Sequence, residues 1–76
     1  MNKPRRKALA DIAERIEGLR EELEALRDEE QEYLDNMPEN LQGSERYERA
    51  EAAVDALDSA LGSLEEAKDS IEEATE

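Results

Sequence analysis

Residues 9–37 read LADIAERIEGLREELEALRDEEQEYLDNM. Apolar residues recur here in alternating steps of three and four, which is the heptad pattern (positions a to g) of a helix that packs against another helix. With Leu9 as position a, the apolar a and d residues are Leu9, Ile12, Ile16, Leu19, Leu23, Leu26, Tyr33 and Met37. The a residue Glu30 interrupts the series, and we interpret it as a polar layer near the end of the helix. The pattern predicts one long helix over about residues 4–36, with a seam that must be buried.

The charge balance would suit a disordered chain if the apolar residues were scattered. There are 10 Lys and Arg against 23 Asp and Glu, which gives a net charge of −13, and aromatic residues make up only 3% of the chain. Such a composition is typical of a disordered polyanion. The apolar residues are in phase, however, and a sequence rich in Glu, Leu, Ala and Arg with this period is typical of a coiled coil.

The sequence lacks the side chains on which most catalytic and metal sites depend. It has no Cys and no His, so it has no thiolate or imidazole group, and its three glycines are isolated rather than gathered in a phosphate-binding loop. The acidic run at residues 28–32 lacks the spacing of a calcium-binding loop. We therefore expect that the protein is not an enzyme and that it has no catalytic residue, no cofactor, no metal and no small-molecule substrate.

Charge and hydropathy also bear on partners and location. No apolar run is long enough for a membrane span or a signal-peptide core, so we expect a cytoplasmic protein of a bacterial host with no membrane partner. Four cations lie within residues 3–7, but the rest of the chain then carries −17, that is, −13 less +4. This remainder argues against binding to nucleic acid phosphates and favours a basic protein surface as a partner.

Residues 37–44 read MPENLQGS and predict a turn. Pro38 pushes Met37 out of helical geometry, and Gly43 and Ser44 add further turn chemistry. Ser44 is a suitable N-cap for a second helix over about residues 45–74. The chain is thus expected to be a single domain, residues 1–76, formed by one helical hairpin.

The second helix repeats the step of three and four. Its expected seam residues are Tyr47, Ala50, Val54, Leu57, Leu61, Leu64 and Ile71, with Lys68 among them. Beside this seam runs a stripe of alanines spaced by seven residues, namely Ala53, Ala60, Ala67 and Ala74. Small residues along one edge would allow another helix to approach closely, although alanine is also simply the best helix former.

A short turn makes the two helices antiparallel. We expect residues to face each other when their numbers add up to about 80, as for Leu26 with Val54, and this register brings the basic N-terminus close to the acidic C-terminal tail. Two helices alone leave the alanine stripe and half of each seam residue uncovered. The sequence therefore predicts an all-α fold, an antiparallel two-helix coiled-coil hairpin, which forms a homodimer as a four-helix bundle.

Residues 35–48, DNMPENLQGSERYE, resemble the centre of a family of short acidic proteins from phages and mobile elements of Gram-positive bacteria, which are generally uncharacterised. The resemblance implies a phage or mobile-element setting and no activity. Met37, Pro38 and Leu41 are candidates for contact with a partner at this turn. The alternative is that the turn residues only connect the helices.

Two functional hypotheses remain open. The first is a structural or protein-interaction module, a dimeric bundle whose surface binds another protein. The second is an acidic mimic of nucleic acid that inhibits a host defence or DNA-binding protein by presenting rows of carboxylates to its basic cleft.

Overall fold

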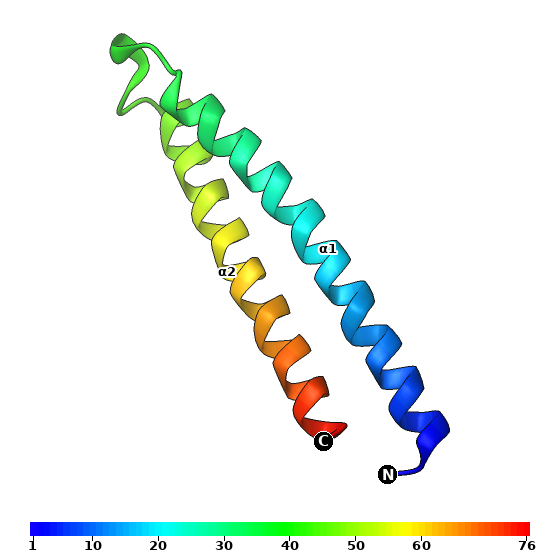
Figure 1. The fold of residues 1–76 in the computed structure, drawn as a ribbon. Coiled ribbons are helices and arrows are strands. Elements are labelled where there is room, and N and C mark those ends of the chain that lie inside the picture. The colour runs from blue at the N-terminus through cyan, green and yellow to red at the C-terminus, as the bar shows by residue number, and fades with distance from the viewer.

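The computed structural model describes all residues, 1–76, as two long antiparallel helices joined by a short loop (Figure 1). Helix α1 spans Lys3–Asp35, a 3₁₀ turn η1 spans Glu39–Leu41, and helix α2 spans Glu45–Ala74. The hairpin measures 60 × 15 × 13 Å. The expected all-α helical hairpin is confirmed, and the structure has no strand.

Side-chain caps explain where each helix begins. The Oδ1 atom of Asn2 accepts a hydrogen bond from the backbone N–H of Arg5 at 2.8 Å, and Pro4 lies in the first turn. Ser44 caps α2 in the same way, because its Oγ accepts from the N–H of Tyr47 at 3.3 Å. Both caps satisfy N–H groups that have no partner within the helix.

The loop reverses the chain within nine residues, from Asn36 to Ser44. Pro38 follows the buried Met37 and lies in extended backbone geometry before η1. Gly43 adopts a φ of 84°, a left-handed conformation that glycine reaches without steric cost. This geometry lets the N–H of Ser44 bond to the carbonyl of Leu41 and directs the chain into α2.

The contact between the helices uses a different face of α1 from the expected one. The buried or half-buried apolar residues of α1 occupy positions a and e, namely Leu9, Ala13, Ile16, Leu23 and Leu34. The d residues Ile12, Leu19, Leu26 and Tyr33 were expected in the seam, but they are 36%, 55%, 59% and 48% exposed. In the single hairpin these four residues therefore lie at the edge of the helix–helix contact, and about half of each side chain is uncovered.

Geometry and charge together explain this choice of face. Around a helix, position a is flanked by d on one side and by e on the other. Helix α2 packs on the e side, where Ala13 permits close approach and Leu34 packs against Ala50 and Val54. On the same side, Arg27 Nε donates to Asp58 at 2.7 Å. The d side remains open because one helix covers only part of the circumference of another.

The expected seam residues of α2 do lie on its inner face. Ala50 and Val54 are buried, and the others are half-buried: Tyr47, Leu57, Leu61, Leu64, Lys68 and Ile71. The register of the two helices differs from the expected one. Three interhelical ion pairs join residues whose numbers add up to 85, whereas the expected sum for facing residues was about 80. These pairs are Glu17 with Lys68, Arg20 with Glu65, and Arg27 with Asp58.

Candidate interaction surface

The exposed d residues of α1 form a row of apolar side chains along the hairpin. Ile12, Leu19, Leu26 and Tyr33 recur every seven residues, so they project from one side of a straight helix. We call these four residues the α1 stripe. Single exposed apolar residues are ordinary on protein surfaces, but an aligned series of large ones makes this side of α1 a candidate interaction surface.

The alanines of α2 extend this apolar face. Tyr33 and Ala53 line the same shallow hollow beside Glu30, which places the alanine edge of α2 on the same side of the hairpin as the α1 stripe. Ala53 and Ala60 are half-buried, whereas Ala67 and Ala74 are exposed. The small side chains therefore flank the large ones over much of the length of the molecule.

The total surface is large for a folded chain of this size. Only 5 of 76 residues are buried, and the accessible surface is 5644 Å². A compact monomer of 8.6 kDa would expose about 4,700 Å². The excess is comparable to the roughly 800 Å² that each partner buries in a standard protein–protein interface.

The opposite edge of the hairpin is held by charges. Arg20 bonds to Glu17 and Glu24 at 2.9 Å each and lies 3.5 Å from Glu65, while Lys68 Nζ lies 3.1 Å from Glu17. Hydrogen bonds from Arg20 and Lys68 lower the pKa of Glu17 from 4.5 to about 2. Because its polar groups are already paired, this edge is the less suitable one for an apolar partner.

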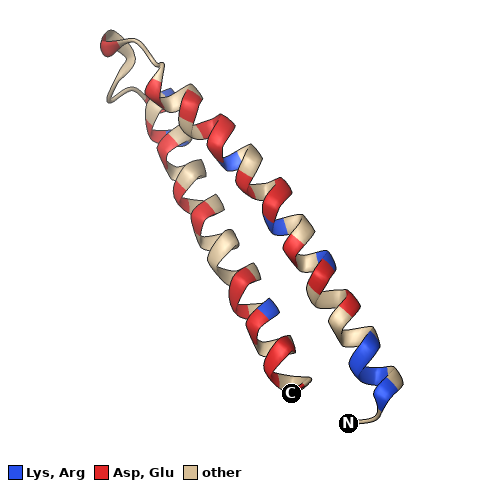
Figure 2. Ribbon diagram, in the orientation of Figure 1, with Lys and Arg blue, Asp and Glu red and all other residues tan.

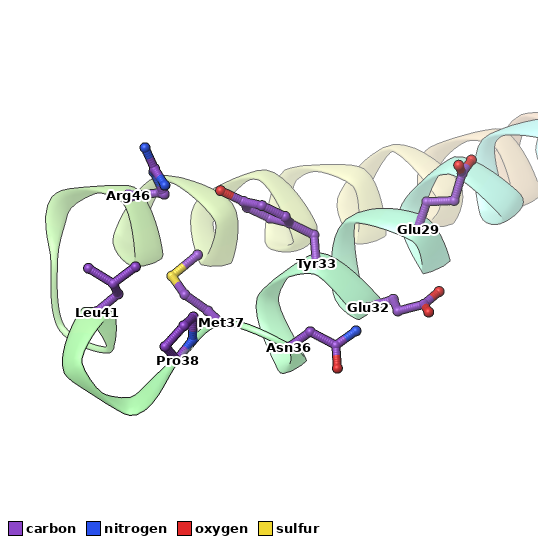
Figure 3. Close-up of a pocket in the computed structure, with 8 residues that line it drawn as sticks. All are labelled: Glu29, Glu32, Tyr33, Asn36, Met37, Pro38, Leu41 and Arg46. Atoms are coloured by element: carbon purple, nitrogen blue, oxygen red, sulfur yellow. The ribbon is translucent and has the colours of Figure 1, made fainter.

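A second candidate feature is a hollow of about 440 Å³ at the loop end (Figure 3). Figure 3 shows Tyr33 of α1 and Leu41 of the loop on either side of the Met37 side chain. The expected contact residues Met37, Pro38 and Leu41 all line this hollow. We call it the loop hollow; its full lining is Glu29, Glu32, Tyr33, Asn36, Met37, Pro38, Leu41 and Arg46.

Sequence reasoning did not identify the polar members of the loop hollow. Glu29 and Glu32 form no ion pair within the hairpin, and neither does Arg46. The spacing of three residues between the two glutamates places them on one helical face next to Tyr33. This signal was present in the sequence, but it could be interpreted only once the loop had been placed.

The basic N-terminus does not pair with the acidic tail as expected. None of the seven ion pairs includes Lys3, Arg5, Arg6 or Lys7. The register explains this result: facing residues add up to 85, so Glu72 and Glu76 lie opposite Ala13 and Leu9 rather than opposite the cations at residues 3–7. The N-terminal turn of α1 therefore projects past the end of α2, and its cations stay free (Figure 2).

No group of three or more acidic side chains is placed to hold a metal ion, and neither helix has an apolar stretch long enough to cross a bilayer. Comparisons of the chain with protein-family models, with curated proteins and with solved structures found no match. The functional proposal consequently depends on the geometry of the α1 stripe and the loop hollow.

Proposed function

We propose that the protein is a non-enzymatic structural or protein-interaction module that associates with itself through the α1 stripe. Two hairpins placed with these faces together form a four-helix bundle, in which the stripe joins the seam residues of each copy in one core. The observation that carries the proposal is the exposure of four large apolar residues in heptad register.

The heptad spacing itself favours a helix as the occupant of this face. Residues seven apart in a helix meet those of a second helix by knobs-into-holes packing, and the a residues beneath the stripe already belong to the α1–α2 seam. A second hairpin would therefore extend an existing core. The resemblance in residues 35–48 supports a phage or mobile-element setting, in the cytoplasm of a bacterial host.

The proposal is tested by molar mass in solution, measured by light scattering behind a sizing column over a dilution series. We expect the wild-type protein to be a dimer and Leu19→Glu to be a folded monomer. Leu19 is 55% exposed in the hairpin, so the substitution costs little packing within one copy.

Ala52→Glu is the matched control, because it adds the same charge on an exposed position of α2 away from the stripe. It should remain dimeric. A wild-type protein that is a monomer at all concentrations, with helical circular dichroism intact, would exclude self-association.

A second candidate is the nucleic-acid mimic, because acidic residues follow both helices along the 60 Å hairpin (Figure 2). This function predicts that the protein releases a fluorescent DNA duplex from a basic DNA-binding protein, and that salt weakens this competition. Equal competition by the monomeric Leu19→Glu variant would separate this activity from self-association.

A further inference from the structure

We propose that the two copies of the dimer pair α1 against α1 in antiparallel orientation, with Arg15 of each copy placed beside Glu29 of the other. The inference rests on the proposed self-association and specifies which helices meet. The two-fold axis then crosses the helices at right angles. In the alternative bundle the axis runs along the helices, and α1 meets α2 of the second copy.

The packing within one hairpin already directs the α1 stripe towards a second pair of helices. Helix α2 lies on the a and e side of α1. Each residue of a helix advances by about 100°, so position d lies about 80° from the direction midway between a and e. In a four-helix bundle of square cross-section, each helix has its two neighbours about 90° apart. The α1 stripe therefore points where the second neighbour of α1 belongs.

The spacing of the α1 stripe sets the register between two antiparallel copies. In a two-fold interface, residue i contacts residue j of the partner and residue j contacts residue i. All four stripe residues are matched when Ile12 faces Tyr33 of the second copy and Leu19 faces Leu26. The numbers of facing residues then add up to 45. A shift by one heptad in either direction would leave one stripe residue of each copy without an apolar partner.

This register brings together two charged residues that have no partner within one hairpin. Arg15 and Glu29 are exposed, and neither forms an ion pair. Both occupy position g, which borders position d on the side away from α2, and the two-fold axis places the g residues of both copies on the same side of the contact. Their numbers add up to 44, so they are offset from exact facing by one residue, about 1.5 Å along the helix. Each dimer contains two such pairs.

The remaining g residues set the balance of charge along this contact. Glu22 is exposed and adds up to 44 with itself, so its two copies face each other across the two-fold axis and repel. Asn36 faces Ala8, and neither is charged. The row thus has two attractive pairs and one repulsive pair. Removal of the charge of Glu22 should therefore tighten the dimer.

The alternative bundle places no carboxylate directly opposite Arg15. An axis along the helices keeps α1 and α2 of the second copy at the same level as within one hairpin, where the numbers of facing residues add up to 85. Arg15 would then face Ser70, and Glu29 would face Ala56. Charge complementarity consequently favours the antiparallel pairing of α1 with α1.

The alanine edge of α2 is compatible with the same axis. Its alanines match across two antiparallel copies of α2 when their numbers add up to 127, as for Ala53 with Ala74 and Ala60 with Ala67. The axis then crosses α2 between residues 63 and 64, and it crosses α1 between residues 22 and 23. These two levels add up to 86, within one residue of the value of 85 that the ion pairs set for one hairpin.

Charge reversal at position g tests the pairing, with the dimer dissociation constant measured by sedimentation. Arg15→Glu and, separately, Glu29→Lys should each weaken the dimer about 10-fold, because each reversal makes both pairs repulsive. Both substitutions in one chain should restore wild-type affinity at wild-type net charge, and Glu22→Gln should lower the dissociation constant. Glu66→Lys is the matched control for Glu29→Lys, since this exposed residue of α2 forms no ion pair.

A distance between the two copies tests the direction of the axis. The chain has no cysteine, so Lys7→Cys gives a single site for a spin label on an exposed residue. In the antiparallel pairing Lys7 lies level with residue 38 of the second copy, which separates the two labels by about 47 Å along the helices at a rise of 1.5 Å per residue. With the axis along the helices, both labels lie at one end of the bundle. They are then within about 25 Å of each other, because neighbouring helices are about 10 Å apart.

The outcomes separate this inference from the proposed function. A dimer with the short distance, or one in which the doubly substituted chain binds no better than the single variants, would overturn the antiparallel pairing while self-association stands. A wild-type protein that is a monomer would overturn both. The long distance together with recovery of affinity in the doubly substituted chain would support both.

Discussion

Two leucines of α1 that occupy different heptad positions should respond very differently to truncation. Leu34, at position e, is 8% exposed and packs against Ala50 and Val54, whereas Leu26, at position d, is 59% exposed. A heptad seam through positions a and d would require the opposite order. Leu34→Ala and Leu26→Ala therefore distinguish the observed packing from the pattern in the sequence.

The expected magnitudes follow from the fraction of each side chain that is buried. Replacing leucine by alanine removes three carbons, each worth about 0.8 kcal/mol when fully buried, or about 2.4 kcal/mol in all. Leu34→Ala should lower the free energy of unfolding by about 2 kcal/mol, near the lower limit for core leucines, because its cluster adjoins a loop that can relax. Leu26→Ala should cost only about 1 kcal/mol, since less than half of its side chain is buried.

The measurement is urea unfolding followed by circular dichroism, in the Leu19→Glu background that keeps the hairpins apart. In the dimer, Leu26→Ala should become more costly, and its cost should rise with protein concentration because the α1 stripe is then covered. An equal cost of the two substitutions in the monomer would refute the seam through positions a and e.

Two further predictions concern the charged edge and the loop. Because the pKa of Glu17 is lowered, its pairing with Arg20 stabilises the hairpin above pH 4.5, and this stabilisation is lost as the pH falls towards 2. The difference in stability between the wild type and Glu17→Gln should therefore shrink over that range. Glu21→Gln, at a glutamate that forms no ion pair, is the control. A pH-independent difference would contradict the pairing. Gly43→Ala should lower the free energy of unfolding by about 1 kcal/mol because its φ is 84°. Gly62→Ala lies inside α2, where an added Cβ would meet no other atom within 4 Å, and it should raise the free energy of unfolding by about 1 kcal/mol. The same sign for both glycine substitutions, measured by urea unfolding, would argue against the left-handed turn at Gly43.

Local signals predicted the elements of the fold closely. Helix α1 begins at Lys3 and ends at Asp35, one residue before the expected limits at each end, and α2 has the expected bounds 45–74. These boundaries depend on neighbouring residues: Asn2 and Ser44 as caps, and Pro38 as the residue that ends helical geometry. Such interactions are short in range, so a single sequence contains them.

The candidate surfaces were only partly accessible from the sequence. Met37, Pro38 and Leu41 were expected to act together, and they do line one hollow. In the sequence, Glu29 and Glu32 are distinguished only as members of the acidic run at residues 28–32. Their place beside the loop depends on how the chain folds back over the end of α1, and this is not contained in the periodicity of either helix.

By itself the sequence determined that this chain forms two long amphipathic helices, where each begins and ends, and that the turn makes them antiparallel. Only the tertiary structure decided which side of α1 faces α2 and in which register. Positions d and e both adjoin the a residues, and the d series is the more apolar. Helix α2 nevertheless packs on the e side of α1. There Ala13 permits close approach, and the Arg27–Asp58 and Arg20–Glu65 pairs bridge the helices. That choice depends on the sum of contacts along both helices, and it leaves the more apolar stripe of α1 exposed.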